Sequence, residues 1–507
     1  MLLGAMGVGA AAIAVAVALA READDLEHEA WRALPDVSEV VVSSCTGCHG
    51  PPDPGELARA DWLKSLARMR AIMAERAALE LTDDQYLEVW RYFRNRAPDA
   101  LPLLPADPLD SPLVFSAEPV APPGSVPPLI TSVRAVDIDG DGSAEVLVSD
   151  ARRNTVSVLA RAGDGWTEAV LADVAAPARA AVLDADGDGD LDLAVASLGS
   201  LPPTDGLVGG VVLLDRGPGG YTRRVLLQDV GRVADVRAGD LDEDGDEDLA
   251  VAVFGHVAVG SIGWLEQQSA GDFAYHELEE VAGASHVPVV DIDGDGHLDV
   301  VALVSQASER IDAFLGRGDG TFVKRTLYRA PTPLFGSSGI APADLDGDGD
   351  LDLLYSNGDA FDVPAARSTT MLRPYHGVQW LENRGRRGFV RHDLVRFYGA
   401  FSPVPADLDG DGDLDIVATS LVSDWADPER RSLIWLENDG AQQFTAHGIA
   451  GAPTHLVTAD VADLDGDGRP DIVAGGLHMF GPYDRLGRVT LWASGGSRGR
   501  AAGPPGR

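Results

Sequence analysis

The stretch Asp407-Leu408-Asp409-Gly410-Asp411-Gly412-Asp413-Leu414-Asp415 occurs, in variants, seven times along the chain. Every copy has an acidic residue at positions 1, 3, 5 and 9 and a glycine at position 6. The three early carboxylates can converge on one point only if the backbone turns sharply, and glycine permits that turn. Hard carboxylate oxygens around one centre suit Ca²⁺, which takes about six to eight oxygen ligands.

The sequence therefore predicts up to seven Ca²⁺ sites. The candidate ligands are Asp137, Asp139, Asp141 and Glu145; Asp184, Asp186, Asp188 and Asp192; Asp240, Asp242, Asp244 and Asp248; Asp291, Asp293, Asp295 and Asp299; Asp344, Asp346, Asp348 and Asp352; Asp407, Asp409, Asp411 and Asp415; and Asp463, Asp465, Asp467 and Asp471. Solvated Asp-Gly turns are one alternative. An EF-hand is another, but it needs Glu at position 12 and a following helix. Apolar β-rich runs follow here instead, such as Ile416-Val417-Ala418.

The spacing of the copies predicts a repeat architecture. Intervals run from 47 residues (Asp137 to Asp184) to 63 residues (Asp344 to Asp407), a period typical of propellers and solenoids. Each interval contains a strand before the acid loop, an apolar strand after it, a third strand, and a fourth strand after a turn. Trp-Leu-Glu marks the third strand at 264–266, 380–382 and 435–437. Four strands per repeat predict a propeller blade. We expect the tryptophans of the third strands to pack between blades, with sugar stacking as the alternative.

The run Pro470-Asp471-Ile472-Val473-Ala474-Gly475-Gly476, which follows the acids of the seventh copy, resembles an FG-GAP or VCBS-type repeat. Such repeats form propeller blades in integrin α-subunits and in many bacterial surface proteins. The Phe-Gly pair that gives the repeat its name is visible as Phe335-Gly336, and the resemblance covers Leu113 to Ser494. It implies an all-β, seven-bladed propeller over residues 129–494.

Closure of this ring needs a strand from outside the repeats. The seventh repeat shows only three strands, at 457–463, 471–476 and 488–493, and an open sheet edge would favour aggregation. Residues 98–128 read as a Pro-rich linker, but Leu113 to Glu118 inside it has the pattern of a strand. We predict that this segment completes blade seven.

The only two cysteines, Cys45 and Cys48, are followed by His49. Cys-x-x-Cys-His is the attachment signature of a c-type haem, in which two thiols bind the two vinyl groups and the histidine ligates iron. A disulfide or half of a zinc site are the alternatives. Zinc would need two further ligands nearby, and a redox disulfide does not need His49. The motif therefore predicts covalently bound haem c.

Residues 21–97 around this motif predict three short helices. Asp36 to Glu39 and Thr82 to Gln85 read as helix starts, and another helix follows Asp61. The segment resembles a monohaem cytochrome c. In that family the sixth iron ligand is usually Met, so the resemblance implies Met69, with Met73 or a histidine as alternatives. The predicted fold class is multidomain, with a small all-α cytochrome c-like domain followed by an all-β seven-bladed propeller.

The chain ends and the net charge indicate location and partners. Residues 1–20 are almost wholly apolar, which predicts export through a secretory signal peptide or membrane attachment through an N-terminal anchor. We expect a periplasmic, cell-surface or extracellular protein. Residues 495–507 read as a disordered tail. A formal net charge of −40 argues against nucleic acid as a partner.

Two functions fit these features. The first is extracytoplasmic electron transfer, in which the calcium-binding propeller is a docking platform for a redox partner protein. The alternative is a cell-surface adhesion or carbohydrate-binding propeller with an auxiliary haem, whose partner is a surface ligand or glycan. No catalytic constellation stands out in the sequence, so we predict an electron carrier rather than a catalyst. Insertions at 198–210, 356–373 and 420–431 are the expected contact surface.

Overall fold

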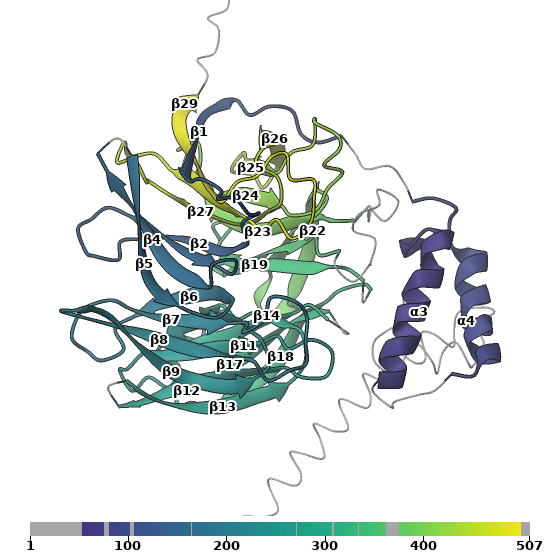
Figure 1. Ribbon diagram of the computed structural model, residues 1–507, viewed down its shortest axis with the longest axis horizontal. Helices are drawn as coiled ribbons and strands as arrows, with labels where there is room; N and C mark the ends of the chain where they lie inside the picture. The colour runs from purple at the N-terminus through teal and green to yellow at the C-terminus, as the bar shows by residue number, and fades with distance from the viewer. Residues whose placement is uncertain are drawn as a thin grey trace, which may run out of the picture. The chain divides into compact units, whose positions relative to one another are not determined.

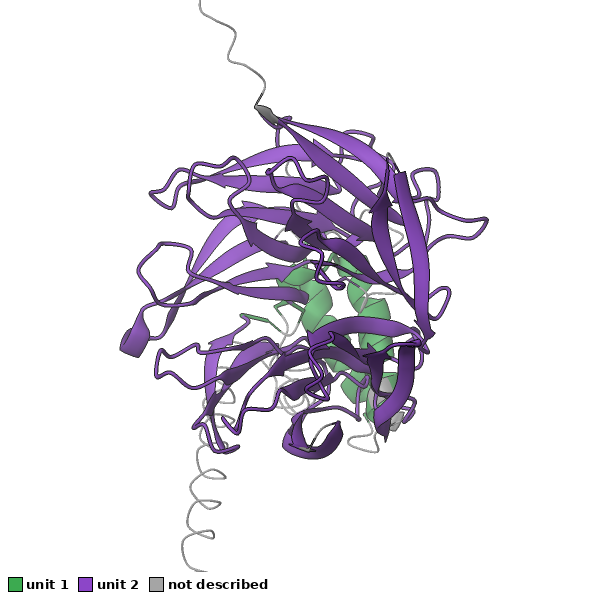
Figure 2. Cartoon of the chain, turned by 90° about the vertical axis from the view of Figure 1, so that its left-hand side faces the viewer, with its two compact units in different colours: residues 1–101, 331–334 green, residues 102–330, 335–507 purple. Residues whose placement is uncertain are grey.

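The computed structural model of the 507-residue chain describes residues 53–75, 81–101, 106–163, 165–269, 271–306, 309–332, 334–360 and 375–497. The chain divides into two compact units, residues 1–101 with 331–334, and residues 102–330 with 335–507 (Figure 2). No helix within the described ranges has the length and apolar character needed to cross a membrane. The predicted export segment, residues 1–20, and the predicted first helix lie outside these ranges.

The described part of the first unit is helical. It contains the short 3-10 helix η1 (Pro54–Glu56) and the helices α3 (Arg59–Glu75) and α4 (Asp83–Arg96). Thr82 and Gln85 form a capping box at the start of α4, as the sequence predicted. The ring of Trp62 in α3 stacks on Phe93 in α4 with centroids 4.1 Å apart, and both side chains are buried. These aromatic rings give the two helices a small apolar core.

The second unit is an all-β propeller, in which the described strands form seven sheets (Figure 1). Each sheet is made of strands that follow one another in the chain, except that β1 joins the last sheet. The blades are β2 (Ile130–Val136) to β5 (Gly165–Asp173), β6 (Pro177–Leu183) to β9 (Gly220–Val230), β10 (Val233–Gly239) to β13 (Asp272–Glu280), β14 (Ala284–His286) to β18 (Phe322–Arg329), β19 (Ser337–Ala343) to β22 (Phe389–Arg396), β23 (Ala400–Ala406) to β26 (Phe444–Ala450), and β27 (Leu456–Ala462) to β29 (Val489–Ser497) with β1 (Leu113–Ala121). The strands not yet bounded are β3 (Glu145–Asp150), β4 (Thr155–Ala162), β7 (Asp192–Ser197), β8 (Gly209–Gly217), β11 (Asp248–Val253), β12 (Ser261–Ser269), β15 (Val289–Val290), β16 (Asp299–Val304), β17 (Arg310–Gly316), β20 (Asp352–Asn357), β21 (Gly377–Asn383), β24 (Asp415–Ser420), β25 (Leu433–Asn438) and β28 (Asp471–Gly476).

The second strand of each blade forms the centre of its sheet. All six residues of β3, and of its counterparts β7, β11, β16, β20, β24 and β28, are buried. Both faces of such a strand pack against neighbouring blades, which explains the unbroken apolar runs seen in the sequence. The fourth strands are largely exposed, as in β5 and β13. The core therefore lies between the blades.

The tryptophans of the third strands lie in these inter-blade cores, as predicted. Trp264 packs between blades three and four, Trp380 between five and six, and Trp435 between six and seven. Their exposed fractions are 3%, 6% and 0%. Rings this covered have no free face on which a sugar could stack, so the structure does not support that alternative for these residues.

Blade seven joins the two ends of the propeller. β1 pairs antiparallel with β29, with Phe115 opposite Ser494 and Glu118 opposite Leu491 (Figure 1). The closing strand predicted at Leu113 to Glu118 is confirmed and extends to Ala121. β29 also continues to Ser497, three residues into the segment predicted to be a disordered tail. The remainder of that segment, from residue 498, lies outside the described ranges.

The two rims of the propeller differ in kind. The loop between the first and second strands of every blade is an acid loop, and the opposite rim carries the loops between the second and third strands. Since all second strands end on the same rim, the three predicted insertions, which follow β7, β20 and β24, share it. We call this the insertion rim. Of the middle insertion, the structure describes residues 356–360 only.

Candidate metal loops

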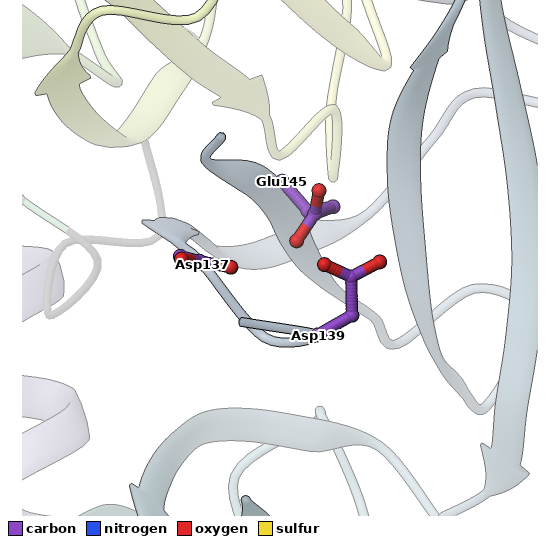
Figure 3. A group of neighbouring side chains, drawn as sticks. All are labelled: Asp137, Asp139 and Glu145. Carbon is purple, nitrogen blue, oxygen red and sulfur yellow. The ribbon is translucent and has the colours of Figure 1, made fainter. Parts of the chain in front are cut away.

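Each acid loop brings carboxylates together at the point where the first strand turns into the second. In the first loop, oxygens of Asp137, Asp139 and Glu145 all lie within 4.8 Å of one another. Figure 3 shows these three side chains, with the carboxylates of Asp139 and Glu145 turned toward one another. In the next two loops the acids at the same positions, 1, 3 and 9, meet: Asp184, Asp186 and Asp192, and Asp240, Asp242 and Asp248. In the fourth and fifth loops the acids at positions 1, 3 and 5 meet instead: Asp291, Asp293 and Asp295, and Asp344, Asp346 and Asp348. The structure thus brings together residues that the sequence predicted as ligands.

The first aspartate of the loop fixes its backbone. Asp137 Oδ1 accepts hydrogen bonds from the backbone N–H of Gly140 (2.8 Å) and Asp141 (3.1 Å), and Oδ2 accepts one from Gly142 (2.9 Å). Both glycines have positive φ, 77° and 91°. That conformation is strained for residues with a Cβ, so it explains why glycine stands at position 6. The turn is therefore built by local hydrogen bonds.

The acids at positions 3 and 5 are tied down through one oxygen each. In the sixth loop, Asp409 Oδ1 accepts from the N–H of Asp411 (3.2 Å), and Asp411 Oδ1 accepts from the N–H of Asp413 (3.0 Å). Among the described residues, neither Oδ2 atom has a hydrogen-bond donor. These oxygens are the ones that remain available to a cation.

The acid at position 9 has a second role, which sequence reasoning missed. Asp415 accepts hydrogen bonds from the N–H of Leu408 in the loop (3.0 Å) and of Asn438 at the end of the third strand (2.8 Å). The same pair of bonds, 2.7–3.1 Å long, occurs in blades two to seven. In blade one, Glu145 accepts from Ile138 only, among the described residues. The position-9 carboxylate is thus a buried link between the loop and the third strand.

Burial sets the protonation of these position-9 acids. It raises the pKa of Asp248 and Asp415 to about 7, and that of Asp299 and Asp352 to about 6. Backbone hydrogen bonds partly oppose the rise, and neighbouring carboxylates, such as Asp242 beside Asp248, add to it. A buried carboxylate surrounded by like charges is stabilised by a proton or by a bound cation. The donor set consists of oxygens, which suits Ca²⁺.

The predicted haem ligands are not brought together by the described residues. Met69 lies in α3 and is half-buried, as is the alternative ligand Met73. Cys45, Cys48 and His49 lie outside the described ranges. The donor set of two thiols, a histidine and a methionine fits a c-type haem by its chemistry. Haem binding therefore stays a prediction.

A repeated tryptophan–histidine–glutamate group was also missed from the sequence. His276 stacks on Trp264 with centroids 5.1 Å apart, and its Nε2 lies 2.7 Å from Glu266 Oε2. Blades five and six repeat the group with Trp380, His392 and Glu382, and with Trp435, His447 and Glu437. The signal was available, since a histidine follows twelve residues after each of these tryptophans (Trp264 to His276). The group packs the outer part of a blade.

Residues 137–195, 291–355 and 422–474 match the model of an FG-GAP-like repeat, so the chain contains FG-GAP-like repeats arranged as a seven-bladed propeller. Among curated proteins, none matches the chain. Among solved structures, a chain from the crystal structure of BBS1N in complex with ARL6DN, soaked with lead, is 11% identical, with a TM-score of 0.46 over 76% of this chain and 98% of that chain.

Proposed function

We propose that the protein is an exported electron carrier, in which an N-terminal haem c transfers electrons and a calcium-stiffened propeller is the docking platform for a redox partner or surface ligand. The FG-GAP-like propeller is compatible with a platform. The observation that supports calcium is the recurrence of one carboxylate arrangement in loops that the described strands hold in place. The feature that supports electron transfer is the motif Cys45-x-x-Cys48-His49.

The N-terminal residues have distinct parts in this proposal. Cys45 and Cys48 would hold the group covalently, and His49 and Met69 would be the ligands of its iron. When bound, haem c accepts and donates single electrons. A Met/His ligand pair would favour electron transfer over oxygen chemistry at the iron. Residues 1–20 would direct export, which fits the motif because haem c is attached to exported chains.

The insertion rim is the surface that we assign to the redox partner or surface ligand. Asp205, from the insertion of blade two, accepts hydrogen bonds from the N–H of Val257, Ala258 and Val259 in blade three, at 2.8–3.1 Å. Arg485, in the corresponding loop of blade seven, donates to the carbonyls of Trp425 and Gly451. These bonds hold neighbouring loops in fixed positions. A fixed surface of varied loops suits recognition.

The test is the absorption spectrum of the full chain made in a host that matures c-type cytochromes. We expect covalently bound haem with a low-spin spectrum that carbon monoxide does not shift. The variant Cys45→Ser with Cys48→Ser should lose the haem and keep the propeller, measured by circular dichroism. Absence of covalent haem from the wild-type chain would overturn electron transfer while leaving the propeller platform intact.

The sixth ligand can be tested in the same spectrum. Met69→Ala should open one axial position, so that carbon monoxide binds and the low-spin bands are lost. Met73→Ala is the matched control, because both methionines are half-buried in α3. A low-spin Met69→Ala spectrum would assign the ligand to Met73 or a histidine.

A further inference from the structure

Three arginines lie on the innermost strands of consecutive blades. They are Arg134 in β2, Arg179 in β6 and Arg237 in β10. Arg134 and Arg237 lie at the same height along the propeller axis by strand register. Val136 pairs with Glu145 and Gly239 pairs with Asp248, and each arginine stands two residues before the first member of its pair. In blade two, Leu183 pairs with Asp192, and Arg179 stands four residues before Leu183, so it lies two residues further from the acid loop than the other two arginines. We call these residues the axial arginine cluster.

The three side chains converge within the ring. Contacts between neighbouring first strands run through all seven blades and back to β2, so these strands surround the axis of the propeller. Arg134 and Arg237 belong to blades one and three, yet the charge of Arg237 helps to lower the pKa of Arg134, after burial as the main cause. Burial, with Arg237 next, lowers the pKa of Arg179 to about 10. The Nε atoms of Arg179 and Arg237 lie 3.2 Å and 3.1 Å from the same oxygen, Asp235 Oδ1, so side chains from blades two and three meet at one carboxylate.

Two carboxylates accompany the cluster, and both already have other partners. Asp235 is fully buried and accepts from Nε of Arg237 at 3.1 Å through each oxygen. It also accepts from the N–H of Val236 and Val287. The oxygens of Asp460, in blade seven, accept from backbone N–H groups of β2 and β27. His286 Nδ1 also lies 3.7 Å from Asp235 Oδ2 and brings no negative charge. Among the described residues, three guanidinium groups therefore face two carboxylates, which leaves a positive charge uncompensated.

The guanidinium groups retain donors for a ligand. Arg179 contacts Asp235 through Nε (3.2 Å), and the side chains of Arg179 and Arg237 are each 28% exposed, whereas that of Asp235 is 0% exposed. Arg134 makes no hydrogen bond or ion pair with any of the described residues. Across the same ranges, the terminal Nη atoms of all three arginines have no acceptor. Forked guanidinium donors of this kind bind carboxylate, phosphate and sulfate oxygens in pairs.

We propose that the axial arginine cluster is a binding site for one small oxyanion, a carboxylate, sulfate or phosphate group, held on the axis of the propeller. The anion supplies the missing negative charge and accepts from the free Nη donors of blades one, two and three. A site of this kind links blades that share no sheet. It is independent of the acid loops, which lie on one rim of the ring.

The experiment is equilibrium dialysis of the full chain, with Ca²⁺ present, against labelled sulfate or labelled acetate at constant ionic strength set by sodium chloride. We expect one sulfate or one acetate to bind per chain. Tighter binding of sulfate would identify a tetrahedral oxyanion as the ligand, and tighter binding of acetate a planar carboxylate. Arg134→Gln should weaken binding about tenfold or more, because a charge-assisted donor is lost. Arg223→Gln, an exposed arginine on β9, is the matched control and should bind like the wild type.

Two results would overturn the proposal, and folding is checked by circular dichroism in each variant. One is the absence of saturable binding of both anions to the wild-type chain. The other is equal binding by Arg134→Gln and wild type. If Arg134→Gln does not fold, Arg179→Gln replaces it with the same expected weakening, and unchanged binding by that variant counts against the site.

Discussion

The acid-loop rim and the insertion rim of the propeller are built on opposite principles. On the first, seven loops repeat one turn, in which the N–H of the glycine at position 6 donates to Oδ2 of the aspartate at position 1. On the second, the loops differ in length and are tied to their neighbours by unique contacts, such as Asp205 to blade three and Arg485 to blade six. Repetition suits a task that every blade shares, whereas variation suits recognition. The rims should therefore respond differently to cations, charge removal and pH.

Removing calcium should have the largest effect, and it should act through the acid-loop rim. A ligand that binds only the native state stabilises it by about 2.7 kcal/mol per site at a free concentration 100 times its Kd, and there are seven loops. We expect a chelator to lower the melting temperature by many degrees, and excess Ca²⁺ to restore it. The measurement is a thermal melt followed by circular dichroism. An identical melt with and without chelator would refute calcium as a structural ligand.

Removing one buried charge should show how far the insertion rim depends on unique contacts. Arg488 stands at the start of β29, is 2% exposed, and contacts Asp150 (2.9 Å) and Glu168 (2.7 Å) of blade one. Arg488→Met should lower the free energy of unfolding by about 3–5 kcal/mol, because both acids lose their buried partner. The control is Arg153→Met, since Arg153 faces the same acids but is 44% exposed. Its cost should be about 1 kcal/mol or less by urea denaturation.

A smaller effect separates the two roles within one acid loop. In chelator, Asp415→Ala should cost about 1–3 kcal/mol per buried N–H left unpaired, those of Leu408 and Asn438. Asp409→Ala should cost much less in chelator, because the N–H of Asp411 that it accepts from is exposed and can bind water instead. With Ca²⁺ present, both variants should lose one bound ion of the seven, counted by titration. Equal stability of the two variants in chelator would contradict the linking role of position 9.

The smallest effect concerns pH, because the titratable groups of the two rims contribute to stability with opposite signs. Burial lowers the pKa of His455 to about 3 and of His478 to about 4, below the usual 6.5, so the unfolded chain takes up protons first. Their contribution to stability is complete above about pH 6.5 and is lost as pH falls toward 4. The raised pKa of Asp248 and Asp415 has the opposite sign, since protonation favours the folded state below pH 7 when calcium is absent.

The comparison is made in chelator between pH 7 and pH 5. The variant His455→Gln with His478→Gln should lose less stability on acidification than the wild type, measured by melting temperature. His276→Gln is the control, because His276 is 45% exposed on an outer strand. If the double variant and the wild type change in parallel, the buried histidines do not govern the acid response.

Local chemistry explains what could be predicted from the sequence. The acid loops are encoded within nine residues, so spacing alone predicted their turns and which carboxylates meet. Counting strands in the last repeat predicted that Leu113 to Glu118 closes the ring. The link from Asp415 to Asn438 could not be predicted, because it depends on the register between the second and third strands. The axial arginine cluster joins residues of three blades, and no local pattern marks it.

The pairing of β1 with β29 also fixes when the propeller can form during synthesis. Leu113 pairs with Ser497, so the first strand of the propeller domain has no partner until nearly the whole domain has been made. Contacts this distant in sequence form slowly, and until then β1 and β29 both present open edges. The order of synthesis thus makes ring closure the final step of folding. A chain that has not reached this step has unpaired strand edges and is prone to aggregate.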